Sequence, residues 1–91
     1  MIEKNYTINN KLGLHARPAS LFVKTTGRFK SNIKVVKGDK EIDGKSIMGL
    51  LMLAAAPGTL LKVVADGEDE SQVLVALDDL FARRFDDEDT D

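Results

Sequence analysis

Apolar residues recur along this chain with two different periods, and the alternation of these periods limits its fold more than any other feature. Ile2, Tyr6 and Ile8 stand at even positions among polar neighbours, which is the period of a half-buried strand. Between Ala19 and Thr26 the apolar and methyl-bearing residues follow helical spacing instead. A chain that changes period so soon after its first strand predicts a mixed structure of short strands and helices.

The middle of the chain carries a hairpin signal. Residues 33–35 alternate between apolar and polar side chains, and Gly38 and Asp39 separate them from a second short run at 40–43. Glycine at the first position of a two-residue turn is typical of a tight antiparallel hairpin. We therefore expect two adjacent antiparallel strands here.

Three further segments complete the pattern. Residues 47–56 are apolar on nearly every side and end before Pro57, which predicts a short helix. Residues 60–65 are aliphatic and β-branched around one lysine, which predicts a fourth strand. Three acidic residues at 68–70 then precede an inward-facing helical stripe formed by Val73, Leu74, Leu77, Leu80 and Phe81.

The predicted order of elements is β-α-β-β-α-β-α, which favours the α+β class. We expect a four-stranded, mostly antiparallel sheet with three helices on one face and solvent on the other. A length of 91 residues leaves room for one small domain. Because the chain has no cysteine, apolar burial alone must stabilise that domain.

The charges are unevenly distributed. Of 15 acidic residues, five lie within residues 86–91, which predicts a domain over 1–85 followed by an acidic, disordered tail. Residues 1–85 then carry 13 basic and 10 acidic residues, a net charge of +3 that gives little reason to expect nucleic-acid binding. Because no apolar run approaches the roughly 20 residues of a membrane-spanning helix and no signal peptide is recognisable, we expect no membrane insertion and a cytoplasmic location.

The single histidine lies where a helix is predicted to begin, in the segment Gly13-Leu14-His15-Ala16-Arg17-Pro18-Ala19. Backbone N–H groups at a helix start lack intrahelical partners and favour an anion such as a phosphoryl group. Arg17 can donate to two phosphate oxygens, Pro18 is tolerated in a first helical turn, and a neutral imidazole can act as a nucleophile. With no second His, no Cys and no paired carboxylate nearby, neither a metal site nor a hydrolytic triad can form around His15. A polar histidine without chemistry remains the alternative.

A second candidate segment is Gly44-Lys45-Ser46. A nucleotide-binding P-loop would require glycine at position 39, where the chain has Asp39, together with a strand-to-helix βαβ context that is missing here. We therefore reject that interpretation. Ser46 is instead predicted to be the N-cap of the following helix, its hydroxyl accepting a hydrogen bond from a backbone N–H.

The helix after Ser46 has more apolar residues than one buried stripe needs. Leu50 and Leu53, with Ala54, can fill the inward stripe. The residues left for an exposed edge are Ile47, Met48 and Leu51. An exposed apolar patch usually marks an interaction site, and methionine adapts to partners of different shape, although burial of the whole set remains open.

The two candidate segments, the second extended through Ile47-Met48-Gly49-Leu50, resemble the histidine-containing phosphocarrier proteins of the HPr family over about residues 2–85. The resemblance implies an open-faced β-sandwich with the element order given above. It also implies that His15 takes a phosphoryl group on its pros nitrogen, Nδ1, beside Ala16 and Arg17. The donor would be Enzyme I, phosphorylated from phosphoenolpyruvate, and the acceptor an Enzyme II A component. Such a protein is a carrier and not an enzyme, is expected to be monomeric, and needs no cofactor or metal; the motifs fit both the sugar branch and the nitrogen branch, whose carrier is NPr.

The resemblance further implies regulation and docking. Ser46 matches the serine that HPr kinase/phosphorylase modifies in some members, although Gly44 before Lys45 departs from some regulated relatives and leaves that switch open. The implied docking residues, beside Arg17, are Lys24, Lys45, Ile47, Met48 and Leu51. Two other functions remain open: a regulatory binding module acting through Ser46 and the apolar patch without phosphotransfer, and an acyl-carrier-like protein using Ser46.

Overall fold

The computed structural model of the protein describes residues 1–86. Its elements are β1 (Ile2–Thr7), α1 (Ala16–Thr26), β2 (Asn32–Lys37), β3 (Lys40–Asp43), α2 (Ile47–Leu53), β4 (Leu60–Asp66), α3 (Glu70–Ala82) and a short 3-10 helix, η1 (Arg84–Asp86). This order confirms the predicted β-α-β-β-α-β-α pattern and adds one terminal turn. The predicted acidic tail lies outside the described residues, apart from Asp86 at the end of η1.

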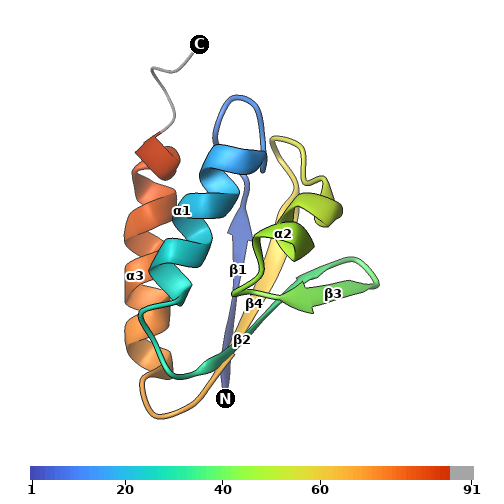
Figure 1. The fold of residues 1–91 in the computed structure, drawn as a ribbon. Coiled ribbons are helices and arrows are strands. Elements are labelled where there is room, and N and C mark those ends of the chain that lie inside the picture. The colour runs from blue at the N-terminus through green and yellow to red at the C-terminus, as the bar shows by residue number, and fades with distance from the viewer. Residues whose placement is uncertain (87–91) are drawn as a thin grey trace.

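The four strands form one sheet in the order β1-β4-β2-β3, and every pair in it is antiparallel. Val63 of β4 pairs with Lys4 of β1 on one side and with Val35 of β2 on the other. The three α-helices cover one face of this sheet (Figure 1). The α+β class and the open-faced sandwich are confirmed. Within residues 1–86 no helix is long and apolar enough to span a bilayer.

The predicted hairpin and first helix also form. Gly38, with φ +60°, opens the two-residue turn between β2 and β3, where Val35 pairs with Ile42. α1 continues to Thr26, and Gly27 follows as its C-cap. The apolar stripe of α1 faces the sheet, since Phe22 and Ala19 are fully buried.

An aromatic cluster closes the core at the end where α3 meets β1. Tyr6 stacks on Phe81 with ring centroids 4.5 Å apart, and Phe85 meets Phe81 edge-on at 4.8 Å. Phe85 belongs to η1 and reaches the core through a left-handed backbone conformation, with φ 57° and complete burial. Burial raises the pKa of Tyr6, and its hydroxyl donates a 2.7 Å hydrogen bond to the Asp78 carboxylate. The core therefore extends to the last described turn.

The predicted helix over residues 47–56 ends earlier than expected. α2 stops at Leu53, and Ala54 follows as a left-handed C-cap with φ 50°. Ala54 is therefore exposed, which corrects its predicted inward position, and Ala55 is buried in its place. The Lys37 ammonium group donates to the carbonyl oxygen of Leu53 at 2.8 Å and so satisfies one of the free carbonyls at this helix end.

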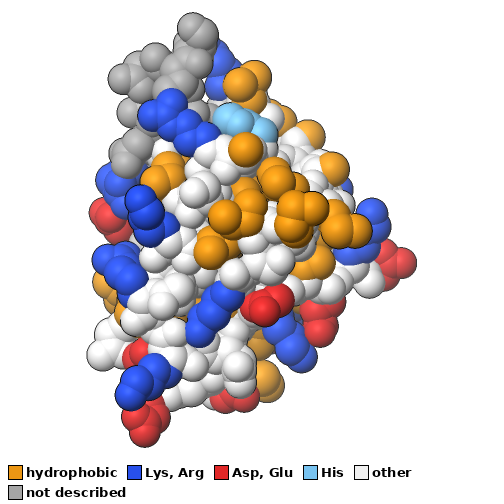
Figure 2. All heavy atoms as spheres, viewed as in Figure 1, with side chains coloured by type: hydrophobic (Ala, Val, Ile, Leu, Met, Phe, Trp, Pro, Cys, Tyr) orange, Lys and Arg blue, Asp and Glu red, His pale blue; other side chains and the backbone are white. Residues whose placement is uncertain are grey.

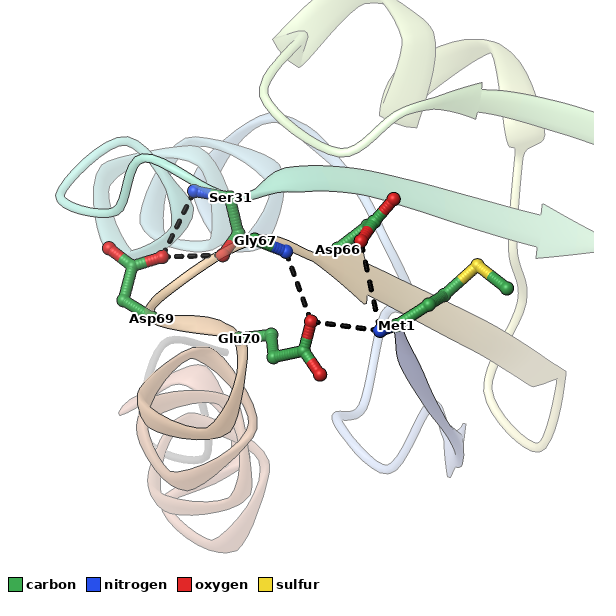
Figure 3. Close-up of polar contacts among 6 residues, drawn as sticks. All are labelled: Met1, Ser31, Asp66, Gly67, Asp69 and Glu70. Atoms are coloured by element: carbon green, nitrogen blue, oxygen red, sulfur yellow. Dashed lines mark hydrogen bonds and ion pairs between the residues drawn. The ribbon is translucent and has the colours of Figure 1, made fainter.

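The connections α1–β2 and β4–α3 lie at the end of the molecule away from the start of α1 (Figure 1), and carboxylates tie them together (Figure 3). Asp69 accepts hydrogen bonds from the backbone N–H groups of Lys30 and Ser31 and from the Ser31 hydroxyl. Glu70 accepts from the Gly67 N–H and pairs with the N-terminal ammonium group, both at 3.0 Å. These hydrogen bonds lower the pKa of both carboxyl groups. The largest cause is the Ser31 hydroxyl for Asp69 and the Gly67 N–H for Glu70. We call this set of contacts the carboxylate junction.

Candidate functional site

His15 occupies the N-cap of α1, in extended backbone conformation (φ −109°, ψ −166°) and with its side chain partly exposed. Its N–H donates to the Gly13 carbonyl oxygen at 3.1 Å, and its own carbonyl oxygen accepts from Ala19 at 2.9 Å. Both backbone groups of His15 are thus fixed, while no side chain caps the helix at this position. The partly exposed imidazole is therefore attached to a backbone that two hydrogen bonds hold in place.

The first turn of α1 presents few but well-placed donors. Ala16 and Arg17 are the first two helical residues, so their N–H groups have no intrahelical acceptor. Pro18, in the third position, has no N–H at all, and its side chain is buried. Arg17 is exposed, and the first turn contains no acidic residue. The start of α1, which favours negative charge, therefore combines the N–H groups of Ala16 and Arg17 with two residues, His15 and Arg17, whose side chains can act on an anion.

The loop before His15 is held against the connection between α2 and β4. Gly13 has φ +79°, and a Cβ there would stand 2.6 Å from the carbonyl oxygen of Ala55. Leu14 is buried, and its N–H donates to that same oxygen at 2.8 Å. Only glycine fits this close approach, which explains its position two residues before the histidine.

Hydrophobic side chains gather over α2, and the histidine lies on the same face of the molecule (Figure 2). Leu50 and Leu53 are buried as predicted, whereas Met48 is 67% exposed. The exposed members, which we call the α2 patch, are Ile47, Met48 and Met52, with Leu51 partly buried beside them. The sequence reasoning missed Met52, although its spacing of four residues from Met48 could have revealed it.

A second exposed apolar residue was also missed. Leu12, 63% exposed, lies in the loop three residues before His15. A leucine among polar loop residues gives no periodic signal, so only the folded loop shows its exposure.

The basic residues named for docking differ in their surroundings. Arg17 and Lys24 are exposed on α1. Lys45 is partly buried, and its ammonium group donates to the Phe29 carbonyl oxygen at 2.7 Å. Its charge thus lies at the loop that follows α1.

Ser46 is the N-cap of α2, as predicted. Its hydroxyl oxygen accepts a hydrogen bond from the Gly49 N–H at 3.0 Å. The side chain is partly exposed and precedes the first residue of the α2 patch. The Ser46 hydroxyl therefore combines a structural role with access from solvent.

Comparison with known proteins agrees with this arrangement. The family model "PTS HPr component phosphorylation site" matches residues 2–83. The phosphocarrier protein HPr of Neisseria meningitidis serogroup A is 48% identical over 85 residues, which cover 93% of this chain and 96% of that protein. Pseudomonas aeruginosa HPr is 48% identical over 81 residues, covering 88% of this chain and 90% of the relative. A crystal structure of HPr-C-His from Thermoanaerobacter tengcongensis has a TM-score of 0.92 at 45% identity, covering 97% of this chain and 99% of the other. The chain therefore belongs to the HPr family of phosphocarrier proteins of the phosphotransferase system.

Proposed function

We propose that His15 is the residue on which this phosphocarrier holds its phosphoryl group. One observation carries the proposal: the imidazole occupies the N-cap of α1, beside the first-turn N–H groups of Ala16 and Arg17 and with no acidic residue in that turn. A dianionic phosphoryl group bonded to the ring would meet a positive helix end and the Arg17 guanidinium group. The carrier would receive it from phosphorylated Enzyme I and pass it to an Enzyme II A component.

The transfer step needs only the ring and the incoming phosphorus. The lone pair of unprotonated Nδ1 forms the N–P bond while the bond from phosphorus to the donor's leaving atom breaks. The leaving atom keeps the electron pair, and the proton on the other ring nitrogen, Nε2, stays in place. In the second transfer an atom of the acceptor bonds to the phosphorus while the N–P bond breaks. Nδ1 keeps that electron pair, so the carrier returns to its starting form.

The α2 patch is proposed as the surface that both partners contact. Exposed apolar residues at the edge of a reactive group exclude water from an encounter without enclosing the site. Arg17 and Lys24 stand on the neighbouring helix with Lys45 nearby, and they would steer a partner that carries acidic groups. We propose that the protein is a monomer, so that no second copy covers this surface, and that it acts in the cytoplasm.

Ser46 is proposed as a regulatory phosphorylation site for an HPr kinase/phosphorylase. A phosphate there would add about −1.5 to −2 charges at the start of α2, directly before the α2 patch. The helix start tolerates this charge, whereas an acidic partner would be repelled. Incubation with such a kinase and ATP should phosphorylate wild-type protein and not Ser46→Ala.

Radiolabelled phosphoenolpyruvate and Enzyme I provide the decisive test. Wild-type protein should acquire an acid-labile, alkali-stable label, and His15→Ala should acquire none while remaining folded. Equal labelling of His15→Ala would refute the assignment. Absence of label from wild-type protein, combined with loss of partner binding in Ser46→Ala, would favour a regulatory binding module instead.

A further inference from the structure

The loop that carries His15 is supported from inside the protein by a buried amide. Asn10 is 2% exposed, and few polar side chains among residues 1–86 are buried to this degree. Its Nδ2 donates to the Gly13 carbonyl oxygen at 2.7 Å, and its backbone carbonyl oxygen accepts from the Gly13 N–H at 3.4 Å. Asn10 therefore closes the turn that leads to His15 through both its side chain and its backbone.

The peptide unit between Gly13 and Leu14 is held at both of its polar ends. Its oxygen accepts from the Asn10 side chain at 2.7 Å, and its N–H, that of Leu14, donates to Ala55 at 2.8 Å. Glycine permits the positive φ of position 13 but does not enforce it, because glycine samples many backbone conformations at similar cost. The two hydrogen bonds select one orientation of the peptide plane.

That orientation is transmitted to the histidine. The Gly13 oxygen that Asn10 holds also accepts the His15 N–H, at 3.1 Å. If this peptide rotated, the His15 N–H would lose its acceptor, and the backbone that carries the ring would shift relative to the first turn of α1. Misplacement of a reacting group by about 1 Å can cost on the order of 100-fold in rate.

We propose that Asn10 is a positioning residue for phosphoryl transfer: its amide fixes the Gly13–Leu14 peptide plane and thereby the attack geometry of His15. The inference rests on the proposed transfer to His15. Asn10 itself does not touch the phosphoryl group. Its removal should therefore slow the chemical step without weakening the encounter with Enzyme I.

Asn9 offers a matched control. It is the neighbouring residue of the same type, and its Nδ2 donates to the Phe81 carbonyl oxygen at 2.8 Å. That hydrogen bond ties the same loop to α3 and does not involve the Gly13–Leu14 peptide. Asn9→Ala and Asn10→Ala thus both remove an amide-to-carbonyl hydrogen bond, but only the bond from Asn10 leads to the peptide that precedes His15.

The experiment measures rapid-quench transfer from phosphorylated Enzyme I to the three proteins. Asn10→Ala should lower kcat by about 10- to 100-fold with KM changed less than about twofold, while Asn9→Ala should keep the wild-type kcat. Hydrogen exchange at the Leu14 N–H should accelerate in Asn10→Ala only. An unchanged kcat in Asn10→Ala, or equal losses in both variants, would overturn the inference.

Two further arms separate other outcomes. If wild-type protein accepts no label, the proposed function fails, which is a different result from a wild-type rate in Asn10→Ala. If Asn10→Ala does not fold, Asn10→Leu takes its place in the same assay. This variant removes the amide but keeps a similar side-chain volume. In wild-type protein, the Asn10 side-chain N–H hydrogens should exchange slowly, and exchange at the rate of a free amide would also overturn the inference.

Discussion

The helices α1 and α3 begin in opposite electrostatic surroundings. Neither helix has a side-chain cap, but α1 starts at His15 with no acid in its first turn, whereas α3 starts at Asp69 and carries Glu70 in its first turn. Both of these carboxylates already accept backbone hydrogen bonds within the carboxylate junction. The protein thus supplies its own negative charge at one helix start and leaves the other positive.

The difference separates stability from function. An acid in the first turn of α1 would stabilise that helix by about 0.3 to 1 kcal/mol, yet none is present. The absence of an acid there is consistent with the proposed function, because a carboxylate would repel a phosphoryl group on His15. At the start of α3, Asp69 and Glu70 already supply the negative charge and tie the helix to neighbouring loops.

Making α1 resemble α3 should have the largest effect. Ala16→Glu places a carboxylate in the first turn, where it would repel an incoming phosphoryl group at close range. We expect the rate of transfer from Enzyme I to fall about 100-fold, while urea unfolding shows stability unchanged or raised by up to about 1 kcal/mol. Ala16→Gln is the neutral control and should transfer within a few-fold of wild type; an equal loss in that variant would argue for shape rather than charge.

Crowding the carboxylate junction should damage the fold and spare the chemistry. In Gly67→Ala the new Cβ would stand 2.5 Å from the Ser31 hydroxyl oxygen and 2.7 Å from its Cα. We expect the free energy of unfolding to fall by about 1 to 3 kcal/mol, measured by denaturation, with the transfer rate of the folded protein unchanged. Gly13→Ala, by contrast, should impair both properties, and similar transfer defects in the two variants would contradict the separation of the two ends.

α2 provides an intermediate case, because a neutral hydroxyl caps it. Ser46→Ala removes the acceptor for the Gly49 N–H and should lower the free energy of unfolding by about 1 kcal/mol. Ser46→Asp keeps an oxygen acceptor and should retain most of the stability. Equal thermal stability of wild type and Ser46→Ala would mean that the cap contributes nothing.

The smallest effect concerns pH. The folded-state pKa of Asp69 lies below its ordinary value of 3.8, so its hydrogen bonds stabilise the fold above that pH and are lost as the pH falls through the folded value. Thermal unfolding between pH 5 and 2 should show Tm falling less steeply in Asp69→Asn than in wild type. Parallel profiles would show that Asp69 does not couple protonation to folding.

Local patterns were sufficient for the order of elements and for the position of His15. Strand and helix periods identified each segment, and Ser46 marked the start of α2 because a capping hydroxyl acts only a few residues away. The end of α2 could not be read in the same way. Three consecutive alanines carry no stop signal, and the contact that helps to close the helix comes from Lys37, 16 residues earlier in the chain.

The buried hydrogen bond that supports the His15 loop could not be predicted from the sequence either. An asparagine three residues before a glycine suggests a turn, but only the folded loop shows the Asn10 amide reaching the Gly13 carbonyl oxygen behind the histidine. Asp69 and Ser31 are 38 residues apart, so their contact follows from the topology of the sheet. Long-range polar contacts of this kind depend on three-dimensional closure, which no local period encodes.

The place of β4 in the sheet has a consequence for synthesis of the chain. β4 is the last strand to be synthesised, yet it lies between β1 and β2 in the sheet. β1 and β2 are not paired with each other, so β4 is needed to join them. The first strand must therefore wait for a partner about 60 residues further on, and this long loop closure sets an entropic barrier early in folding. A nascent chain that has not yet released residue 66 from the ribosome can form its β2–β3 hairpin, α1 and α2, but neither its four-stranded sheet nor α3.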